Sequence, residues 1–226
     1  MNPRMKIGLF GGTFNPIHLG HLRAAEEICD FFALERMIFI PSSDPPHKEK
    51  EEILPAPLRA EMVRLAVSDN PRFALSGVEL DRPGKSYSIE TIEDFRRELG
   101  AGTHLYFIVG LDAFLEITGW KEYASLFGLC HFVVMTRPGF EKNFSREHLP
   151  VELADEFCYD TQKGGYAHTS GFLVYPAEIT GLDISSRRIR EFLRKGNSIR
   201  YLVPPAVEAF IQTNHLYRNK DSEATG

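Results

Sequence analysis

The stretch KIGLFGGTFNPIHLGHLRAAEEICDFFALERMIFIP, residues 6–41, decides the fold. Residues 6–10 are an apolar run that predicts a strand buried on both faces, and a Gly-Gly turn follows them. Apolar side chains then recur at helical spacing over residues 19–34, and residues 37–41 form a second apolar strand pattern. A strand, about four turns of helix and a second strand are the proportions of a βαβ unit.

The rest of the chain continues this alternation of strands and helices. Further strands are expected at residues 72–76, 104–109, 131–135 and 172–176. Helices are expected at residues 59–68, 88–99, 120–127, 185–195 and 204–213. The alternation predicts an α/β fold of Rossmann-like type, a doubly wound parallel sheet with helices on both faces.

Three segments fall outside this regular pattern. Residues 42–57 are rich in Pro, Lys and Glu and are expected to form a long loop. Residues 139–171 are polar and dotted with glycine, with one short helix near 151–157, and we expect an insertion or a mobile loop region there. Residues 1–218 are expected to form a single domain and residues 219–226 a disordered tail.

Composition and charge exclude several classes of protein. The chain carries 26 Lys and Arg against 31 Asp and Glu, a formal net charge of −5, so an anionic ligand has to be held by a local cluster. A nucleic-acid surface and a membrane partner are therefore not expected, and no apolar run approaches the roughly 18 to 20 residues of a membrane span. No signal-peptide pattern is found near the N-terminus. Cys29, Cys130 and Cys158 form no CxxC pair and predict reduced thiols, mostly in the core, of a cytoplasmic protein.

The turn after the first strand carries the richest chemistry. Open parallel sheets bind ligands at the carboxyl ends of their strands, where Gly11 and Gly12 lie. Such a turn lets backbone N–H groups approach a phosphate, although it is as often only a turn. His18 and His21, in the first turn of the helix, can face one point and donate hydrogen bonds to an anion. Zinc ligation is the weaker alternative, because no Cys, Asp or Glu nearby in the sequence completes a site.

The turn sequence GGTFNPIHLGH, residues 11–21, is neither a GxGxxG fingerprint nor a Walker A loop. It resembles the GGTF-(D/N)-P-x-H-x-G-H signature of the nucleotidylyltransferase superfamily, whose HxGH element contacts the triphosphate of a nucleotide. The resemblance implies that Asn15 faces a second nucleotide and that ATP is bound by the other residues of the turn. These are Gly11, Gly12, Thr13, Phe14, His18 and His21.

A second cluster, LDISSRRIR at residues 182–190, follows the last expected strand. Ser185 or Ser186 is a natural N-cap, and Arg190 lies one turn beyond Ser186 on the same helix face. These groups can converge on one anion, or they belong to an ordinary capped basic helix. ISSRRIR resembles the superfamily's ISS-(S/T)-x-I-R element, with Arg187 where Ser or Thr is usual. The resemblance implies that Ile184, Ser185, Ser186 and Arg190 bind ATP.

Two loop motifs narrow the resemblance. Residues 45–48 read PPHK, by default a solvated turn, and residues 86–88 read SYS. They resemble the PPHK and SYT elements of bacterial nicotinate-nucleotide adenylyltransferases, with Ser88 in place of Thr. The resemblance implies that His47, Lys48 and Ser88 contact the mononucleotide. Ser88 begins a helix whose N–H groups can hold a small carboxylate, a role compatible with a plain N-cap.

The expected strand at residues 104–109 ends in Gly110-Leu111-Asp112, which resembles the family's G-x-D. Asp112 can accept a hydrogen bond from a ribose hydroxyl there. Trp120 is the single tryptophan of the chain and is by default a core residue. The resemblance implies that it stacks on the pyridine ring of the mononucleotide, with Lys121 and Arg137 as nearby cations.

Five motifs in order, from Lys6 to about Tyr217, resemble those of the nicotinate-nucleotide adenylyltransferases. The resemblance implies transfer of the adenylyl group of ATP to nicotinate mononucleotide, giving nicotinate adenine dinucleotide and pyrophosphate in NAD biosynthesis. It implies that His18, His21 and Arg190 are catalytic. It also implies a Mg²⁺ ion held mainly by substrate phosphates, with no metal ligand from the protein.

The sequence is also compatible with three other functions. The nearest is a nicotinamide mononucleotide adenylyltransferase, or another mononucleotide adenylyltransferase of the same superfamily. A fragment of a class I aminoacyl-tRNA synthetase also carries HxGH, but no KMSKS-like segment follows here. A nucleotide-binding sensor without catalysis is a third alternative. The sequence indicates small-molecule partners, ATP and the mononucleotide, and sets no oligomeric state.

Overall fold

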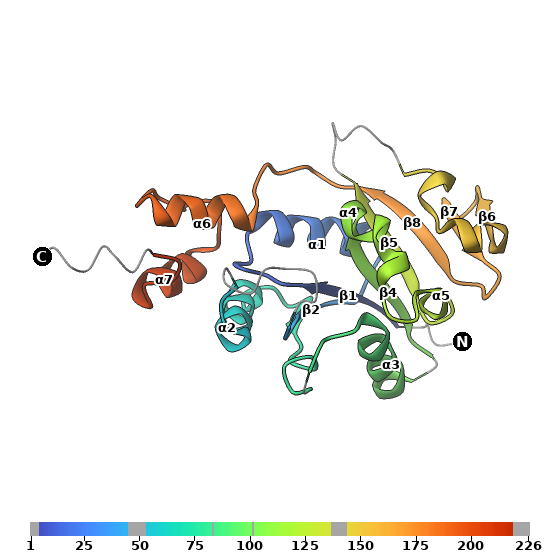
Figure 1. Cartoon of the computed structure of the whole chain (residues 1–226), viewed down its shortest axis with the longest axis horizontal. Helices are drawn as coiled ribbons and strands as arrows, with labels where there is room; N and C mark the ends of the chain where they lie inside the picture. The colour runs from blue at the N-terminus through green and yellow to red at the C-terminus, as the bar shows by residue number, and fades with distance from the viewer. Residues whose placement is uncertain (1–4, 45–52, 83, 101, 137–143, 219–226) are drawn as a thin grey trace, which may run out of the picture.

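The computed structural model describes residues 5–44, 53–82, 84–100, 102–136 and 144–218, drawn in colour in Figure 1. Within these ranges eight strands form one sheet, in the order β3-β2-β1-β4-β5-β8-β7-β6. The strands are β1 (Lys6–Gly12), β2 (Arg36–Pro41), β3 (Phe73–Leu75), β4 (His104–Gly110), β5 (His131–Thr136), β6 (Phe157–Asp160), β7 (Gly165–His168) and β8 (Leu173–Glu178). Strands β1 to β5 and β8 pair in parallel, whereas β6 and β7 pair antiparallel with their neighbours.

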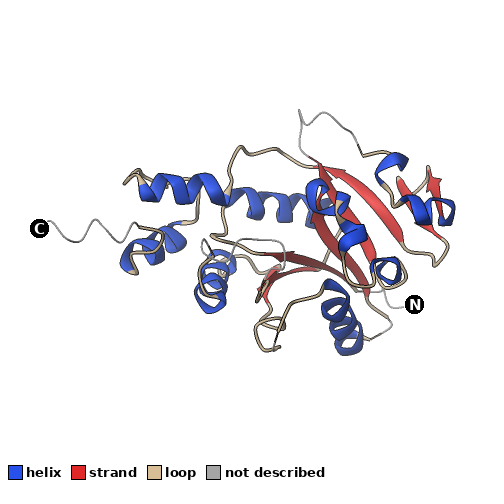
Figure 2. Ribbon diagram, viewed as in Figure 1, coloured by secondary structure: helices blue, strands red, loops and turns tan. Residues whose placement is uncertain are grey.

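Helices cover both faces of the sheet (Figure 2). The α-helices are α1 (Leu19–Phe32), α2 (Ala56–Val67), α3 (Ser88–Leu99), α4 (Leu111–Leu115), α5 (Tyr123–Leu126), α6 (Ser186–Arg194) and α7 (Pro205–Thr213). Short 3₁₀ helices are η2 (Ile117–Gly119), η3 (Arg146–His148) and η4 (Val151–Glu156). None of the helices in the described residues is long and apolar enough to cross a membrane.

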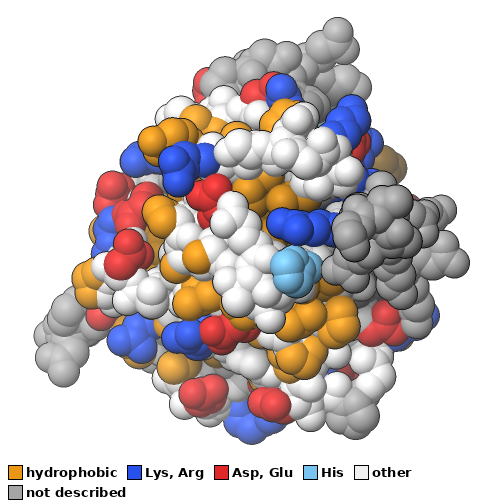
Figure 3. All heavy atoms as spheres, turned by 90° about the vertical axis from the view of Figure 1, so that its left-hand side faces the viewer, with side chains coloured by type: hydrophobic (Ala, Val, Ile, Leu, Met, Phe, Trp, Pro, Cys, Tyr) orange, Lys and Arg blue, Asp and Glu red, His pale blue; other side chains and the backbone are white. Residues whose placement is uncertain are grey.

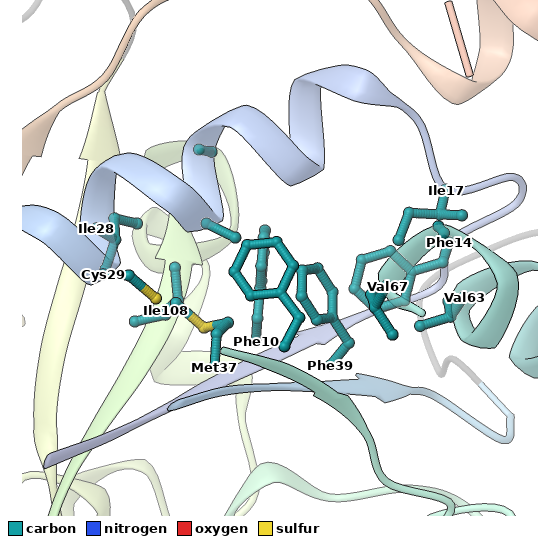
Figure 4. Packing of buried hydrophobic residues seen from close by; sticks show 14 of the residues in the cluster. Phe10, Phe14, Ile17, Ile28, Cys29, Met37, Phe39, Val63, Val67 and Ile108 are labelled. Atoms are coloured by element: carbon teal, nitrogen blue, oxygen red, sulfur yellow. The ribbon is translucent and has the colours of Figure 1, made fainter. Parts of the chain in front are cut away.

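Two hydrophobic cores lie on opposite faces of the sheet because side chains alternate along each strand. On β1, Phe10 joins the core formed with α1, α2 and α7, while Leu9 joins the core formed with α3, α4 and α5. Figure 4 shows the first core, where the Phe10 ring lies 5.5 Å from Phe39 and 5.8 Å from Phe14. Helix α1 forms because its apolar stripe faces this core, and it ends at Ala33, whose φ of 51° is left-handed.

The predicted doubly wound α/β fold is confirmed. The order β3-β2-β1-β4-β5 is that of a Rossmann-like sheet. Successive strands are added on one side of β1 up to β3 and on its other side from β4 onward, so the strand order reverses between β1 and β4. Ligands bind such sheets at this reversal, beyond the carboxyl ends of the strands. The turn after Gly12 and the segment after Gly110 both begin there.

Two parts of the expected secondary structure differ from the structure. The helical stretch expected at 120–127 is shorter in the structure, because Trp120 is extended and Glu122 is left-handed with φ of 52°, so that α5 is limited to four residues within that range. Strands β6 and β7 lie in the segment 139–171, where the sequence predicts no strand. They extend the sheet as an antiparallel hairpin beside β8. The expected short helix in that segment is present as η4.

Candidate active site

The turn after β1 is anchored by Phe14. This residue has a positive φ of 47°, which turns its side chain into the core, where it is 3% exposed. Its ring packs against Phe10 and Phe39, as Figure 4 shows. Phe14 therefore anchors the turn to the core through its side chain. Only the backbone of Phe14 is left to contact a ligand that binds at the turn.

The two histidines of the turn stack on each other. His18 precedes α1 as its N-cap residue, and its ring centroid lies 3.7 Å from that of His21, with 26° between the planes. The Nδ1 atom of His21 accepts a hydrogen bond from the backbone N–H of His18 at 3.2 Å. That bond assigns the neutral His21 ring to the tautomer with a proton on Nε2, which makes Nε2 a hydrogen-bond donor. His18 is 3% exposed, whereas His21 is only partly buried.

Gly20 leaves room for the His18 ring. A Cβ atom at this position would lie 3.1 Å from His18 Nδ1 and 3.2 Å from its Cε1, closer than side chains normally pack. The same Cβ would lie 3.8 Å from the carbonyl oxygen of Ile184, so the second motif also packs against the start of α1. The absence of a side chain at position 20 thus leaves space for the His18 ring where it lies.

The second motif bonds directly to the first, 170 residues away in sequence. Ser186 Oγ donates to the carbonyl of Pro16 at 2.8 Å, and Arg190 Nη1 donates to the carbonyl of Asn15 at 3.0 Å. Ser185 is the N-cap of α6, and its Oγ accepts from the backbone N–H of Arg188. The structure thus brings the predicted ATP-binding residues together, but it uses the Ser186 hydroxyl to hold the turn.

Most other basic side chains of α6 face solvent and lie next to acids. Arg187, at the unusual position of the motif, has a side chain that is 83% exposed and lies 3.9 Å from Glu191. Arg188 pairs with Asp183 at 2.9 Å. Figure 3 shows the end of the molecule that carries α6 and α7, where basic and acidic side chains are interspersed. Of these side chains, Arg190 is the one that reaches the turn.

Asp112 lies at the reversal point of the sheet, in the first turn of α4. Its side chain folds back over Gly110, where a Cβ atom would come within 2.6 Å of Asp112 Oδ1. Because β4 pairs with β1, the end of β4 lies beside the turn that carries Thr13 and the histidines. Asp112 is exposed, so its carboxylate is accessible to a hydroxyl group of a ligand.

A second group of predicted residues gathers at the start of α3. Lys121 Nζ lies 2.7 Å from Glu90 Oε1 and 4.8 Å from the centroid of the Tyr87 ring. The hydrogen bond to Glu90 raises the pKa of Lys121, so its charge is already matched by a carboxylate. Ser88 is the first residue of α3, and Trp120 adjoins Lys121 with its ring 6.1 Å from Phe107, edge to face. Trp120 is partly buried, so packing occupies only part of its surface.

Three predicted residues, His47, Lys48 and Arg137, lie outside the described residues. Two others, Arg59 and Tyr217, were not predicted and contact the turn. Arg59 Nη1 donates to the carbonyl of Thr13 at 2.7 Å, and Tyr217 Oη donates to Asn15 Oδ1 at 2.8 Å. The sequence holds a signal for Arg59, since it stands in the apolar stripe of α2. No comparable signal marks Tyr217.

The chain is similar to known proteins in sequence and in fold. The cytidylyltransferase-like family matches residues 9–192. A Geobacter sulfurreducens protein named as a probable nicotinate-nucleotide adenylyltransferase is 49% identical over 213 residues, which are 94% of this chain and 98% of that protein. A Syntrophotalea carbinolica protein of the same name is 44% identical over 96% of this chain and 99% of its own length. A Plasmodium falciparum nicotinic acid mononucleotide adenylyltransferase complexed with NaAD shares the fold, with a TM-score of 0.71 at 19% identity, over 94% of this chain and 97% of that one.

Proposed function

The chain belongs to the cytidylyltransferase-like family, and from that premise we propose that it transfers the adenylyl group of ATP to nicotinate mononucleotide. The products are nicotinate adenine dinucleotide and pyrophosphate, and the reaction belongs to NAD biosynthesis. Full-length relatives named as probable nicotinate-nucleotide adenylyltransferases, at 44% to 49% identity, support this substrate pair. The observation that carries the proposal is the contact of the turn 13–18 with Ser186 and Arg190 at the reversal point of the sheet.

The reaction places modest demands on the protein. The nucleophile is a phosphate oxygen of the mononucleotide, whose second pKa is about 6, so it is largely ionised at neutral pH. This oxygen forms a bond to the α-phosphorus of ATP while the bond from that phosphorus to the bridging oxygen breaks, and pyrophosphate leaves with the electron pair. No general base is needed. The protein has to align two polyanions in line and neutralise the charge that gathers on the phosphate oxygens.

The residues of the turn suit this task. His21 presents Nε2–H as a donor, because its Nδ1 is bonded to the backbone of His18. His18, stacked beneath it, and Arg190, anchored at the carbonyl of Asn15, complete the proposed catalytic set. Gly11, Gly12 and Thr13 form the approach for the phosphates, with the backbone of Phe14, while Asp112 would accept from a ribose hydroxyl. Ile184, Ser185 and Ser186 complete the proposed ATP-binding set, with Ser186 acting through the carbonyl of Pro16.

The start of α3 suits the mononucleotide. Its N–H groups, at Ser88, favour a carboxylate through the helix dipole, and the partly buried Trp120 offers a ring for the pyridine. Asn15, Lys121, His47, Lys48 and Arg137 complete the proposed set, the last three outside the described residues. Lys121 acts in this proposal by pairing with Glu90 and lowering the negative charge near the nicotinate.

The proposal includes Mg²⁺ bound to the substrate phosphates. We place this ion mainly among phosphate and water oxygens, because Mg²⁺ prefers oxygen ligands and usually keeps several waters beside substrate phosphates. When bound, the ion would neutralise part of the phosphate charge. The protein side chains would then orient the two nucleotides and neutralise the remaining charge on the phosphate oxygens.

One experiment tests the proposed substrates. Pyrophosphate release is followed with ATP and Mg²⁺ and, in parallel, nicotinate mononucleotide, nicotinamide mononucleotide or phosphopantetheine. We expect the highest kcat/KM with nicotinate mononucleotide. Preference for the amide would replace the acid as substrate, and absence of release with all three would contradict the proposed reaction.

A further inference from the structure

Arg59 is a buried cation next to the turn 13–18 that follows β1. We call residues 13–18 the phosphate turn, after the ligand proposed for them. It lies on α2 and is 1% exposed, in the same buried stripe as Met62 and Val63. Its guanidinium makes four hydrogen bonds, each to a backbone carbonyl. Nε donates to Leu54 at 2.8 Å, Nη1 to Thr13 at 2.7 Å, and Nη2 to Ser42 at 2.7 Å and to Ser43 at 3.1 Å.

These carbonyls belong to two segments that flank the site. Thr13 lies in the turn after β1, and because its peptide bond to Phe14 is trans, the N–H of Phe14 points away from the guanidinium. Ser42 and Ser43 follow β2, and Leu54 precedes α2, so they are the two ends of the loop between these elements. One side chain therefore joins the phosphate turn to both ends of this loop.

Asn15 forms a second link between the turn and Leu54. It is 4% exposed, and its Oδ1 accepts from the backbone N–H of Leu54 at 3.3 Å and from Tyr217 Oη at 2.8 Å. Burial raises the pKa of Tyr217, which keeps its hydroxyl protonated as a donor. The turn and the end of the loop are thus tied at two points, one on the backbone of Thr13 and one on the side chain of Asn15.

A guanidinium is suited to this task for two reasons. Its planar fork sends donors in several fixed directions, whereas a lysine has one nitrogen on a flexible stem. It also carries a charge, and among the described residues no carboxylate contacts it. Burying a cation without a counter-ion destabilises a protein, so a neutral group would serve better if the role were only to hold carbonyls. A positive charge behind a turn that receives phosphates has a use that a neutral group lacks.

We propose that Arg59 is a positioning residue for adenylyl transfer, which fixes the phosphate turn and the two ends of the loop 42–54 in one geometry and adds positive charge behind the turn. The inference rests on the proposed function and deepens it, because it assigns the ordering of the site to a residue that touches neither substrate. Loss of the guanidinium should shift the turn against the α-phosphate, and small shifts of this kind strongly reduce turnover.

The test compares Arg59→Lys with Met62→Ala. Met62 is fully buried on the same face of α2, so its truncation lowers stability without removing a bond to the turn. Pyrophosphate release gives kcat and KM, calorimetry gives the Kd for ATP, and circular dichroism identifies a temperature at which both variants are folded. We expect Arg59→Lys to lower kcat by about 10- to 100-fold and weaken ATP binding by about tenfold. Met62→Ala should stay within twofold of the wild type in both.

Each outcome has a defined meaning. Wild-type kcat and Kd in folded Arg59→Lys would overturn the proposal, and so would an equal loss in Met62→Ala, because stability alone would then explain the effect. If Arg59→Lys does not fold, Arg59→Gln decides, because its amide keeps an N–H donor but loses the fork and the charge, with an expected loss of about tenfold or more in kcat, and wild-type kcat in folded Arg59→Gln overturns the proposal. If the wild type releases no pyrophosphate with any mononucleotide, the proposed function fails, and the Kd for ATP alone decides the role of Arg59.

Discussion

His131 should make the stability of this protein sensitive to acid. It begins β5, is 6% exposed, and its Nδ1 accepts from the backbone N–H of Leu173 at 3.1 Å. Its ring stacks on Tyr106, with 4.8 Å between centroids, and its Nε2 lies 3.4 Å from His104 Nδ1. Burial, and then the neighbouring His104, lower the pKa of His131 from 6.5 to about 4.

The sign and size of the effect follow from this pKa. The unfolded chain binds a proton at position 131 near pH 6.5, whereas the folded protein binds it only near pH 4, so unfolding takes up a proton between these values. Stability contributed by the neutral ring is therefore present above pH 6.5 and is lost as the pH falls. The whole window amounts to about 3 kcal/mol in the free energy of unfolding, of which about 2 kcal/mol is lost between pH 7 and pH 4.5.

His131→Gln tests this reasoning, because a glutamine carbonyl can accept from Leu173 but does not titrate. Urea unfolding at pH 7 and at pH 4.5 gives the free energy of unfolding of each protein. We expect the wild type to lose about 2 kcal/mol more than His131→Gln over this interval. His215→Gln, at an exposed position, is the control and should lose as much as the wild type. Parallel losses in the wild type and His131→Gln would refute the argument.

Three further predictions concern activity. His18→Ala should lower kcat by ~10²-fold, the scale of losing one oxyanion donor, with an unchanged circular dichroism spectrum, and wild-type turnover would remove His18 from the catalytic set. Gly20→Ala should displace the His18 ring, 3.1 Å from the new Cβ, and lower kcat by about 10- to 100-fold in the pyrophosphate assay, an outcome that unchanged kcat would contradict. Gly110→Ala should push the carboxylate of Asp112, 2.6 Å from the new Cβ, out of place and weaken ATP binding by about tenfold, and a wild-type Kd in calorimetry would count against Asp112.

The regular parts of the fold were predictable because the spacing of apolar residues along the sequence indicates which side chains are buried in each strand or helix. The pattern of residues 6–41 predicts β1, α1 and β2 with ends that shift by at most two residues, since both faces of these strands and one face of the helix are apolar. The helical stretch expected at 120–127 is shorter than predicted for a local reason. Its apolar spacing fits a helix, but the left-handed Glu122 interrupts it, and no glycine marks that position. Strands β6 and β7 were missed because each buries only its first residue, so that neither shows an alternation of buried and exposed positions.

The residues of the candidate site that the structure brings together were predictable where they lie in contiguous motifs. His18, His21, Ser186 and Arg190 could be chosen because each stands in a short pattern, and the structure brings the two patterns into contact. What the patterns did not indicate is the use of Ser186, whose hydroxyl bonds to the carbonyl of Pro16. The sequence gives the type of a side chain but not its partner when that partner is a backbone atom 170 residues away.

Arg59 is a second side chain whose backbone partners the motifs did not indicate, but its position in the helix pattern is a signal that could have identified it. The formal charge of −5 predicts that the protein has no broad anion-binding surface. In the structure, the exposed cations Arg187 and Arg188 of α6 each lie next to an acid. The guanidinium of Arg59 is instead buried, at the one basic position in the apolar stripe of α2, and in our proposal its charge lies behind the turn that receives the phosphates. Burial without a counter-ion is costly, so a basic residue at such a position indicates carbonyl groups that need it. Here those carbonyls belong to Thr13 in the turn and to Ser42 and Leu54 beside it. A basic residue at a buried helix position therefore indicates which backbone segments of the site are held together.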